Sequence, residues 1–163
     1  MASARTTYQN GQRTEGAKSS GQSFVWISLH DPSPQELAAV QAEFGLPAPL
    51  VDDLGRPAKR PALEVAGELL VAVVKTASWA ADQELVRLGE VQLVLSDGFV
   101  VSVDRDTAIL ERVRQDLQAD PELASAGPAA VLPSVVDHAV EGYGGQLRLP
   151  EDVRAGGGLR AQP

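Results

Sequence analysis

Cysteine is missing from this 163-residue sequence, and histidine is scarce, with only His30 and His138. The absence of cysteine excludes disulfide bonds, thiolate zinc sites and cysteine nucleophiles. Two histidines leave little for histidine-based metal chemistry. Hydrophobic residues make up 44% of the chain and charged residues 22%, as in an ordinary globular domain, which excludes a fully disordered chain, collagen or a coiled coil. The length fits one domain.

Long hydrophobic runs are also missing. The longest uncharged aliphatic run covers residues 69–74, whereas a membrane span needs about 18 to 20 apolar residues. Residues 1–23 have no apolar stretch of the kind found in secretory signals. We therefore expect a soluble, cytosolic chain.

Positive charge is in short supply, and the formal net charge is -8. Residues 24–145 carry eight basic residues against nineteen acidic ones. The negative electrostatic field of this region repels phosphate backbones and concentrates cations. We therefore expect no nucleic-acid partner and favour metal cations as ligands. The alternative is that the surplus carboxylates only keep the domain soluble.

The hydrophobic pattern predicts a mixture of strands and helices. Ser33-Pro34-Gln35-Glu36 has the features of a capped helix start, and Gly45 is expected to end that helix. Ser96-Asp97-Gly98 reads as a hairpin turn, with Gly98 supplying a positive φ. The predicted strands are 24–29, 63–65, 69–77, 86–95 and 99–103, and the predicted helices are 34–44, a short one around 50–54, 106–119, and 131–143, which Pro133 either starts or kinks.

This order of elements predicts an α/β or α+β layered domain. We expect three regions along the chain. Residues 1–23 are polar and small and are predicted to be disordered, residues 24–143 form the domain, and residues 144–163 form a flexible, glycine-rich tail.

The motifs of several enzyme classes are absent. The sequence has no Gly-x-Gly-x-x-Gly after a strand, no phosphate loop, no Gly-x-Ser-x-Gly and no His-Glu-x-x-His. The pairs Asp52-Asp53 and Asp104/Asp106 fall at predicted helix starts or turns, where carboxylates often serve as caps. We therefore predict that the chain is not an enzyme.

A series of short segments, in order, resembles the N-terminal cytosolic domain of CorA magnesium channels over about residues 24–143. The resemblance rests on the order and spacing of these segments together. They are Trp26-Ile27-x-Leu29, Asp31-Pro32, Phe44-Gly45-Leu46, Leu50-x-Asp52-Asp53, Arg60-Pro61-x-Leu63-Glu64, Gly89-Glu90-Val91, Phe99-Val100-Val101, Arg112-Val113-Arg114 and Val135-Val136-Asp137-x-x-Val140-Glu141-x-Tyr143.

The resemblance implies a fold, an assembly and a metal. The fold would be an α/β/α sandwich with a mixed, largely antiparallel sheet, and the assembly a homopentameric funnel on the cytoplasmic side of the membrane. Mg²⁺ held between neighbouring domains would keep the channel closed. By motif, the carboxylates for it are Asp53, Asp52 and Asp137. Mg²⁺ prefers oxygen ligands and keeps several waters, so one or two surface carboxylates are enough.

Simpler interpretations stand beside these assignments. Asp52 and Asp53 could belong to a solvated helix surface, and Asp137 and Glu141 could be an exposed pair of like charges. His138 is expected to be a surface histidine of its helix. The basic connector Arg56, Lys59 and Arg60 is expected to be solvated, with Arg60 paired to an acid, rather than an anion site.

The stalk helix, the two membrane helices and the Gly-Met-Asn signature of the channels have no counterpart in the sequence. We therefore expect a Mg²⁺-sensing domain that does not itself conduct ions, in contact with the membrane only through such missing helices. The isolated domain would be a monomer or a dimer. Two alternatives are a ZntB-type zinc transporter domain and a free-standing interaction module with the same fold.

Overall fold

A computed structural model describes residues 2–9, 12–14 and 23–146. These residues form one seven-stranded sheet with helices on both faces. The strands are β1 (Ala2–Gln9), β2 (Gln12–Thr14), β3 (Ser23–His30), β4 (Ala62–Ala66), β5 (Leu69–Ala80), β6 (Leu85–Leu95) and β7 (Phe99–Arg105). The helices are α1 (Pro34–Phe44), α2 (Ala48–Leu54), α3 (Ile109–Ala119), α4 (Pro121–Ser125), the 3-10 helix η1 (Gly127–Ala130) and α5 (Val131–Gln146).

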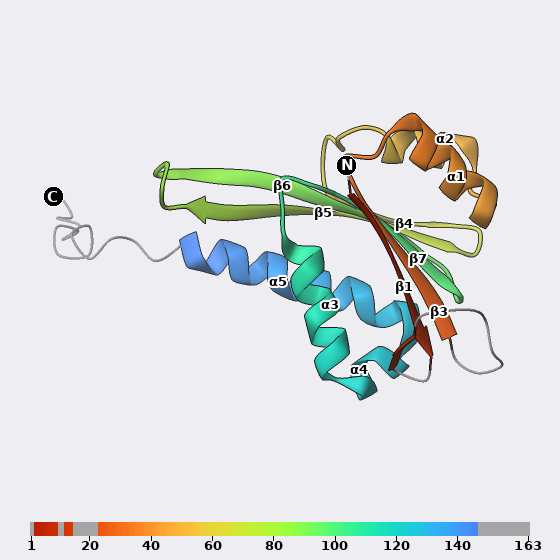
Figure 1. The fold of residues 1–163 in the computed structure, drawn as a ribbon. Helices are drawn as coiled ribbons and strands as arrows, with labels where there is room; N and C mark the ends of the chain where they lie inside the picture. Colours follow the sequence, from red (N-terminus) through yellow and green to blue (C-terminus); the bar gives the residue numbers. More distant parts are fainter. Residues whose placement is uncertain (1, 10–11, 15–22, 147–163) are drawn as a thin grey trace, which may run out of the picture.

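The sheet is mixed, with the strand order β2-β1-β3-β7-β6-β5-β4. Only β3 and β7 among these neighbours run parallel, from Val25 opposite Phe99 to His30 opposite Asp104. Figure 1 shows α1 and α2 on one face and α3, α4 and α5 on the other. The predicted α/β/α sandwich with a mixed, largely antiparallel sheet is confirmed.

Successive side chains along the central strands point to opposite faces of the sheet, and the apolar ones form a separate core on each face. On β3, Trp26 is buried toward α3 and α5, whereas Ile27 and Leu29 are buried toward α1 and α2. Val100 and Val101 of β7 divide in the same way. Both faces of the sheet are therefore covered, as the aliphatic strands predict.

The prediction of disorder for residues 1–23 is wrong for residues 2–9, 12–14 and 23. β1 pairs antiparallel with β3 along its whole length, from Ala2 opposite His30 to Gln9 opposite Ser23. Tyr8 is 1% exposed and stacks on Phe24, with 4.9 Å between the ring centres. Because β1 is short of apolar residues, its order depends on backbone pairing and on Tyr8, which composition cannot reveal.

The α1 boundaries follow the predicted signals. Ser33 Oγ accepts from the Glu36 amide at 3.3 Å, and the Glu36 carboxylate accepts from the Ser33 amide at 2.8 Å. These bonds to Ser33 hold the pKa of Glu36 below its ordinary value. Gly45 ends the helix with φ 65.

Three predicted details of the turns and helix ends are wrong. The β6–β7 turn closes with the Ser96 amide donating to the Phe99 carbonyl at 3.0 Å, but Gly98 does not adopt a positive φ. α3 begins at Ile109 rather than 106 because Asp106 has φ 53, which is incompatible with a helix. Helix α5 includes residues 144–146, which we assigned to a flexible tail, and the rest of that tail lies outside the described residues.

Candidate metal-binding surface

Helix α2 turns an acidic pair toward solvent. Val51 and Leu54 are buried against the α1 and α2 core, so the two residues between them, Asp52 and Asp53, lie on the outer surface. The Asp53 side chain is 77% exposed, and its Oδ1 lies 3.6 Å from Nη2 of the exposed Arg56. An exposed pair of this kind contributes at most about 1 kcal/mol, so it does not prevent Asp53 from binding a cation.

Asp137 is exposed on α5, but its surroundings differ from the prediction. His138, which we expected on the helix surface, is 9% exposed. Its Nε2 lies 2.5 Å from Asp116 Oδ2 and its Nδ1 lies 3.3 Å from Glu141 Oε2. Glu141 also pairs with Arg112 at 3.1 Å. These contacts between α3 and α5 engage Glu141, although its side chain is exposed, whereas Asp137 makes no ion pair with the described residues.

The structure brings Asp52 and Asp53 together but places Asp137 elsewhere. Helix α2 covers one face of the sheet and α5 covers the other (Figure 1). Within residues 2–9, 12–14 and 23–146, no group of three or more histidine, aspartate or glutamate side chains could hold a metal ion. In one copy of the chain, the three predicted ligands therefore cannot share a cation.

A buried carboxylate, Glu90, anchors the segment that follows α2. It is 3% exposed and accepts from Lys75 Nζ at 2.5 Å, Gln92 Nε2 at 2.9 Å, Arg105 Nη1 at 3.0 Å and the Ala58 amide at 3.0 Å. Burial alone would raise the pKa of this carboxyl. The bonds from Lys75, Gln92 and Ala58 outweigh it and hold the pKa of Glu90 below its ordinary value of 4.5.

The same network holds the end of α2 itself. Arg105 Nη2 donates to the Leu54 carbonyl at 2.7 Å, and so satisfies a carbonyl of the last turn of α2. Gln92 Nε2 donates to the Arg56 carbonyl at 2.8 Å, and Lys75 Nζ donates to the Ala58 carbonyl. The sheet thus fixes the position of the acidic pair through β5, β6 and β7.

Sequence reasoning missed Glu90, Gln92 and Arg105 as positioning residues. The available signal was Glu90 and Gln92 spaced two apart in an aliphatic strand, which puts both side chains on one face. A charged residue at such a position needs buried partners.

A groove lies beside α2, between that helix, the connector 56–60 and strands β4 and β5. It has a volume of about 640 Å³, and Asp53 lines it together with the basic connector. Lys59 and Arg60 are exposed, as predicted, but among the described residues the connector residue paired with an acid is Arg56 rather than Arg60. The apolar part of the wall comes from Leu50, Leu54, Val71 and Val73.

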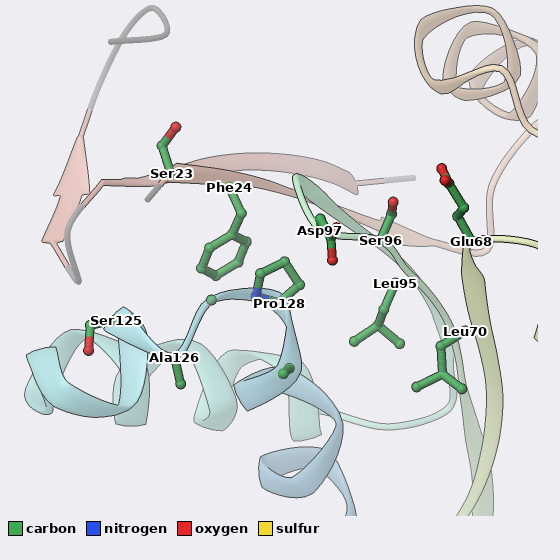
Figure 2. Close-up of a pocket in the computed structure, with 12 residues that line it drawn as sticks. Ser23, Phe24, Glu68, Leu70, Leu95, Ser96, Asp97, Ser125, Ala126 and Pro128 are labelled. Atoms are coloured by element: carbon green, nitrogen blue, oxygen red, sulfur yellow. The ribbon is translucent and has the colours of Figure 1, made fainter. Parts of the chain in front are cut away.

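A second cavity of about 440 Å³ lies on the opposite face, near the β6–β7 turn (Figure 2). The Phe24 ring lies above Pro128 of η1, and Leu70 and Leu95 stand on another side of the cavity. Its acids are Glu68 and Asp97. None of the predicted metal ligands lines this cavity.

His30 and Asp104 meet at the carboxyl ends of the parallel strands β3 and β7. His30 Nδ1 lies 3.0 Å from Asp104 Oδ2, and its Nε2 lies 3.4 Å from Asp31 Oδ2. The bond to Asp104 is the main cause of the raised pKa of His30. Asp104 thus pairs with a histidine, and Asp106 adopts φ 53 before α3, so neither acid caps a helix.

Comparison with known families identifies the chain. The model of the CorA-like Mg²⁺ transporter protein family matches residues 21–152. The chain belongs to this family. The CorA resemblance read from the sequence is thereby confirmed, and a transporter family agrees with the prediction that the chain is not an enzyme. No helix among the described residues has the length and apolar character needed to cross a membrane.

Several solved structures are similar to this chain. Full-length CmaX matches with a TM-score of 0.68 and 15% identity, over 84% of this chain and 44% of that one. The soluble domain of CorA from Methanocaldococcus jannaschii matches with a TM-score of 0.67 and 13% identity, over 88% of this chain and 58% of that one. The ZntB cytoplasmic domain from Vibrio parahaemolyticus matches with a TM-score of 0.58 and 11% identity, over 87% of this chain and 59% of that one.

These similarities show the fold. The chain spans about half the length of the structures it resembles. No curated protein matches the sequence.

Proposed function

We propose that this chain is the cytoplasmic regulatory domain of a CorA-type magnesium transporter and that it senses Mg²⁺ through Asp53, Asp52 and Asp137. The observation that carries the proposal is the exposed acidic pair on α2 in a chain of the CorA family. The domain would lie on the cytoplasmic side of the membrane, in a pentamer of the complete transporter.

The proposed gating involves more than one copy of the chain. A single copy has no cluster of three acidic or histidine side chains among its described residues, so Mg²⁺ would keep most of its waters and bridge acids of neighbouring copies. Helix α2, which carries the pair, and helix α5, which carries Asp137, lie on opposite faces of the sheet (Figure 1), so one copy could offer each to a different neighbour. Binding at Asp53 would replace the weak contact to Arg56.

The expected electrostatic and binding energies are large enough to switch a ring between two states. Two carboxylates about 7 Å apart repel by about 2 kcal/mol at an effective dielectric constant of about 20. A cation present at ten times its dissociation constant would stabilise the bridged arrangement by about 1.4 kcal/mol per site. Five equivalent sites would contribute about 7 kcal/mol, which is enough to shift a two-state ring almost completely. A fall in the cytoplasmic Mg²⁺ concentration would empty the sites and release the closed arrangement of the ring.

The test is a comparison of thermal stability and association state with and without millimolar Mg²⁺. We expect Mg²⁺ to raise the melting temperature and promote association of the wild type, and to do so much less for Asp53→Asn. Asp82→Asn is the matched control, because Asp82 is exposed in the β5–β6 loop and the substitution removes the same charge. An equal Mg²⁺ response in all three proteins would remove Asp53 from the account.

A zinc transporter domain is the second candidate. The similarity to the ZntB cytoplasmic domain favours it. Zinc prefers nitrogen and sulfur ligands, but the chain has no cysteine, and His138 is buried in contacts with Asp116 and Glu141. The same melting experiment with Zn²⁺ separates the two, since a zinc-sensing domain would respond to Zn²⁺ at far lower concentrations than to Mg²⁺.

A further inference from the structure

Strand β4 forms one edge of the sheet and exposes apolar side chains there. All five residues from Ala62 to Ala66 are exposed. Leu63 is 66% exposed and Val65 is 78% exposed, and the two side chains point to the same face because they are two residues apart. Natural edge strands are commonly protected by charge or by a covering element, so two exposed apolar side chains with a single charge, Glu64, between them indicate a binding surface.

The backbone of the same two residues points outward. A two-residue turn, Gly67-Glu68, joins β4 to β5 between the paired residues Ala66 and Leu69, and Gly67 has φ 62. Such a turn closes on a hydrogen-bonded pair, and hydrogen-bonded pairs then alternate along the ladder. Leu63 and Val65 fall in the non-hydrogen-bonded pairs, so their amide and carbonyl groups face the open edge.

Helix α5, which packs against β5, exposes two further apolar side chains. Val136 and Val140 are 40% and 62% exposed and lie four residues apart on one side of α5. His138 and Glu141 mark the other side, because they contact α3. Leu63 lies opposite Ala72 and Val65 opposite Leu70, and the side chains of Ala72 and Leu70 belong to the core between the sheet and α3 and α5. We call Leu63, Val65, Val136 and Val140 the β4 edge surface.

We propose that a second copy of this chain binds the β4 edge surface by antiparallel β4–β4 pairing, which joins the two sheets across a twofold axis at Glu64. A twofold contact does not repeat around a fivefold ring, so this pairing joins isolated domains or chains of two different rings rather than neighbours within one pentamer. In this register Leu63 lies opposite Val65 of the second copy, and both have outward-facing backbone groups. A shift that centres the axis on Leu63 would place Pro61 opposite Val65, and proline has no amide hydrogen to donate.

The register also matches charge and shape. It places Ala62 opposite Ala66 and brings the start of each β4, just after Arg60, toward the turn of the other copy that contains Glu68, so that these opposite charges approach each other twice by symmetry. Leu63 and Val65 of both copies would fill the space between the two α5 helices. The unfavourable element is Glu64 opposite Glu64. The strand is short, so we expect a weak, concentration-dependent dimer.

The test is sedimentation of the full chain over a range of concentrations in a metal chelator, which separates this contact from the Mg²⁺ sites. We expect a reversible wild-type dimer. Val65→Lys should abolish it, and Glu64→Gln should tighten it several-fold by removing the like-charge pair. Leu88→Lys is the matched control, because Leu88 is 72% exposed on β6 and outside the proposed contact. Circular dichroism of each variant would verify the fold.

Hydrogen exchange gives a second readout. The Leu63 and Val65 amides should exchange more slowly as the wild-type concentration rises, and their exchange in Val65→Lys should not depend on concentration. A chain that remains monomeric at every concentration would overturn the proposal. So would a dimer that survives Val65→Lys, or concentration-independent protection of these amides, which would mean that the chain covers its own edge.

Discussion

Arg105 and Glu90 form a buried ion pair, with 3.0 Å between Nη1 and Oε1, beneath the end of the acid-bearing helix α2. The same guanidinium donates to the last carbonyl of that helix, at Leu54. Through these bonds the surface that carries Asp52 and Asp53 is fixed to the centre of the sheet. The geometry of the proposed metal surface therefore depends on residues that would never touch the metal.

Replacing Glu90 should strongly destabilise the fold. Glu90→Gln leaves Arg105 and Lys75 without their buried counter-charge, and removal of one partner of a buried ion pair costs about 3 to 5 kcal/mol. Urea unfolding measures the loss. Asp82→Asn, an exposed control with the same change of charge, should shift the free energy of unfolding by less than about 0.5 kcal/mol. Equal effects of the two substitutions would contradict the network.

Acid should weaken the contribution of Glu90. Its pKa in the folded chain lies below the ordinary value of 4.5, so the ionised carboxylate stabilises the fold above that value, and the contribution is lost as the pH falls through the folded pKa. The difference in unfolding free energy between wild type and Glu90→Gln should shrink on acidification. A constant difference from neutral to strongly acidic solution would show that ionisation of Glu90 is not its source.

Substitutions of Tyr8 test whether the unexpectedly ordered strand β1 contributes to the stability of the fold. Tyr8→Ala removes a buried ring stacked on Phe24 and should cost about 3 to 5 kcal/mol. Tyr8→Phe should be nearly neutral or stabilising, because the buried hydroxyl has no hydrogen-bond partner among the described residues. Thermal melts of the two variants provide the measurement. If Tyr8→Ala melts like wild type, β1 does not contribute to the fold.

Two glycines of α5 should respond in opposite ways to alanine. At Gly142 a Cβ would lie 2.6 Å from the Ala77 carbonyl oxygen of β5, so Gly142→Ala should push the helix off the sheet and cost about 1 to 3 kcal/mol. At Gly144 a Cβ meets nothing within 4 Å, and Gly144→Ala should stabilise the helix by up to about 1 kcal/mol. Chemical unfolding of the pair would reveal the sign of each change.

The local patterns predicted most of the fold. Ser33, Glu36 and Gly45 define α1 as expected because capping depends on a few neighbouring residues. β1 was missed because its order depends on pairing with β3, which is distant in sequence. The acidic pair on α2 was visible in the sequence, since Val51 and Leu54 set its outward direction. The Glu90 network was not, because Arg105 and Ala58 reach Glu90 only after the chain has folded.

The most direct test of the account is an NMR titration of the full chain with Mg²⁺. We predict saturable amide shifts centred on Asp52 and Asp53, with a second set at Asp137, and loss of the first set in Asp53→Asn but not in Asp82→Asn. Small, unsaturated shifts spread over all exposed acids, the same in both variants, would contradict it and would mean that the negative charge of this domain attracts Mg²⁺ without forming a site.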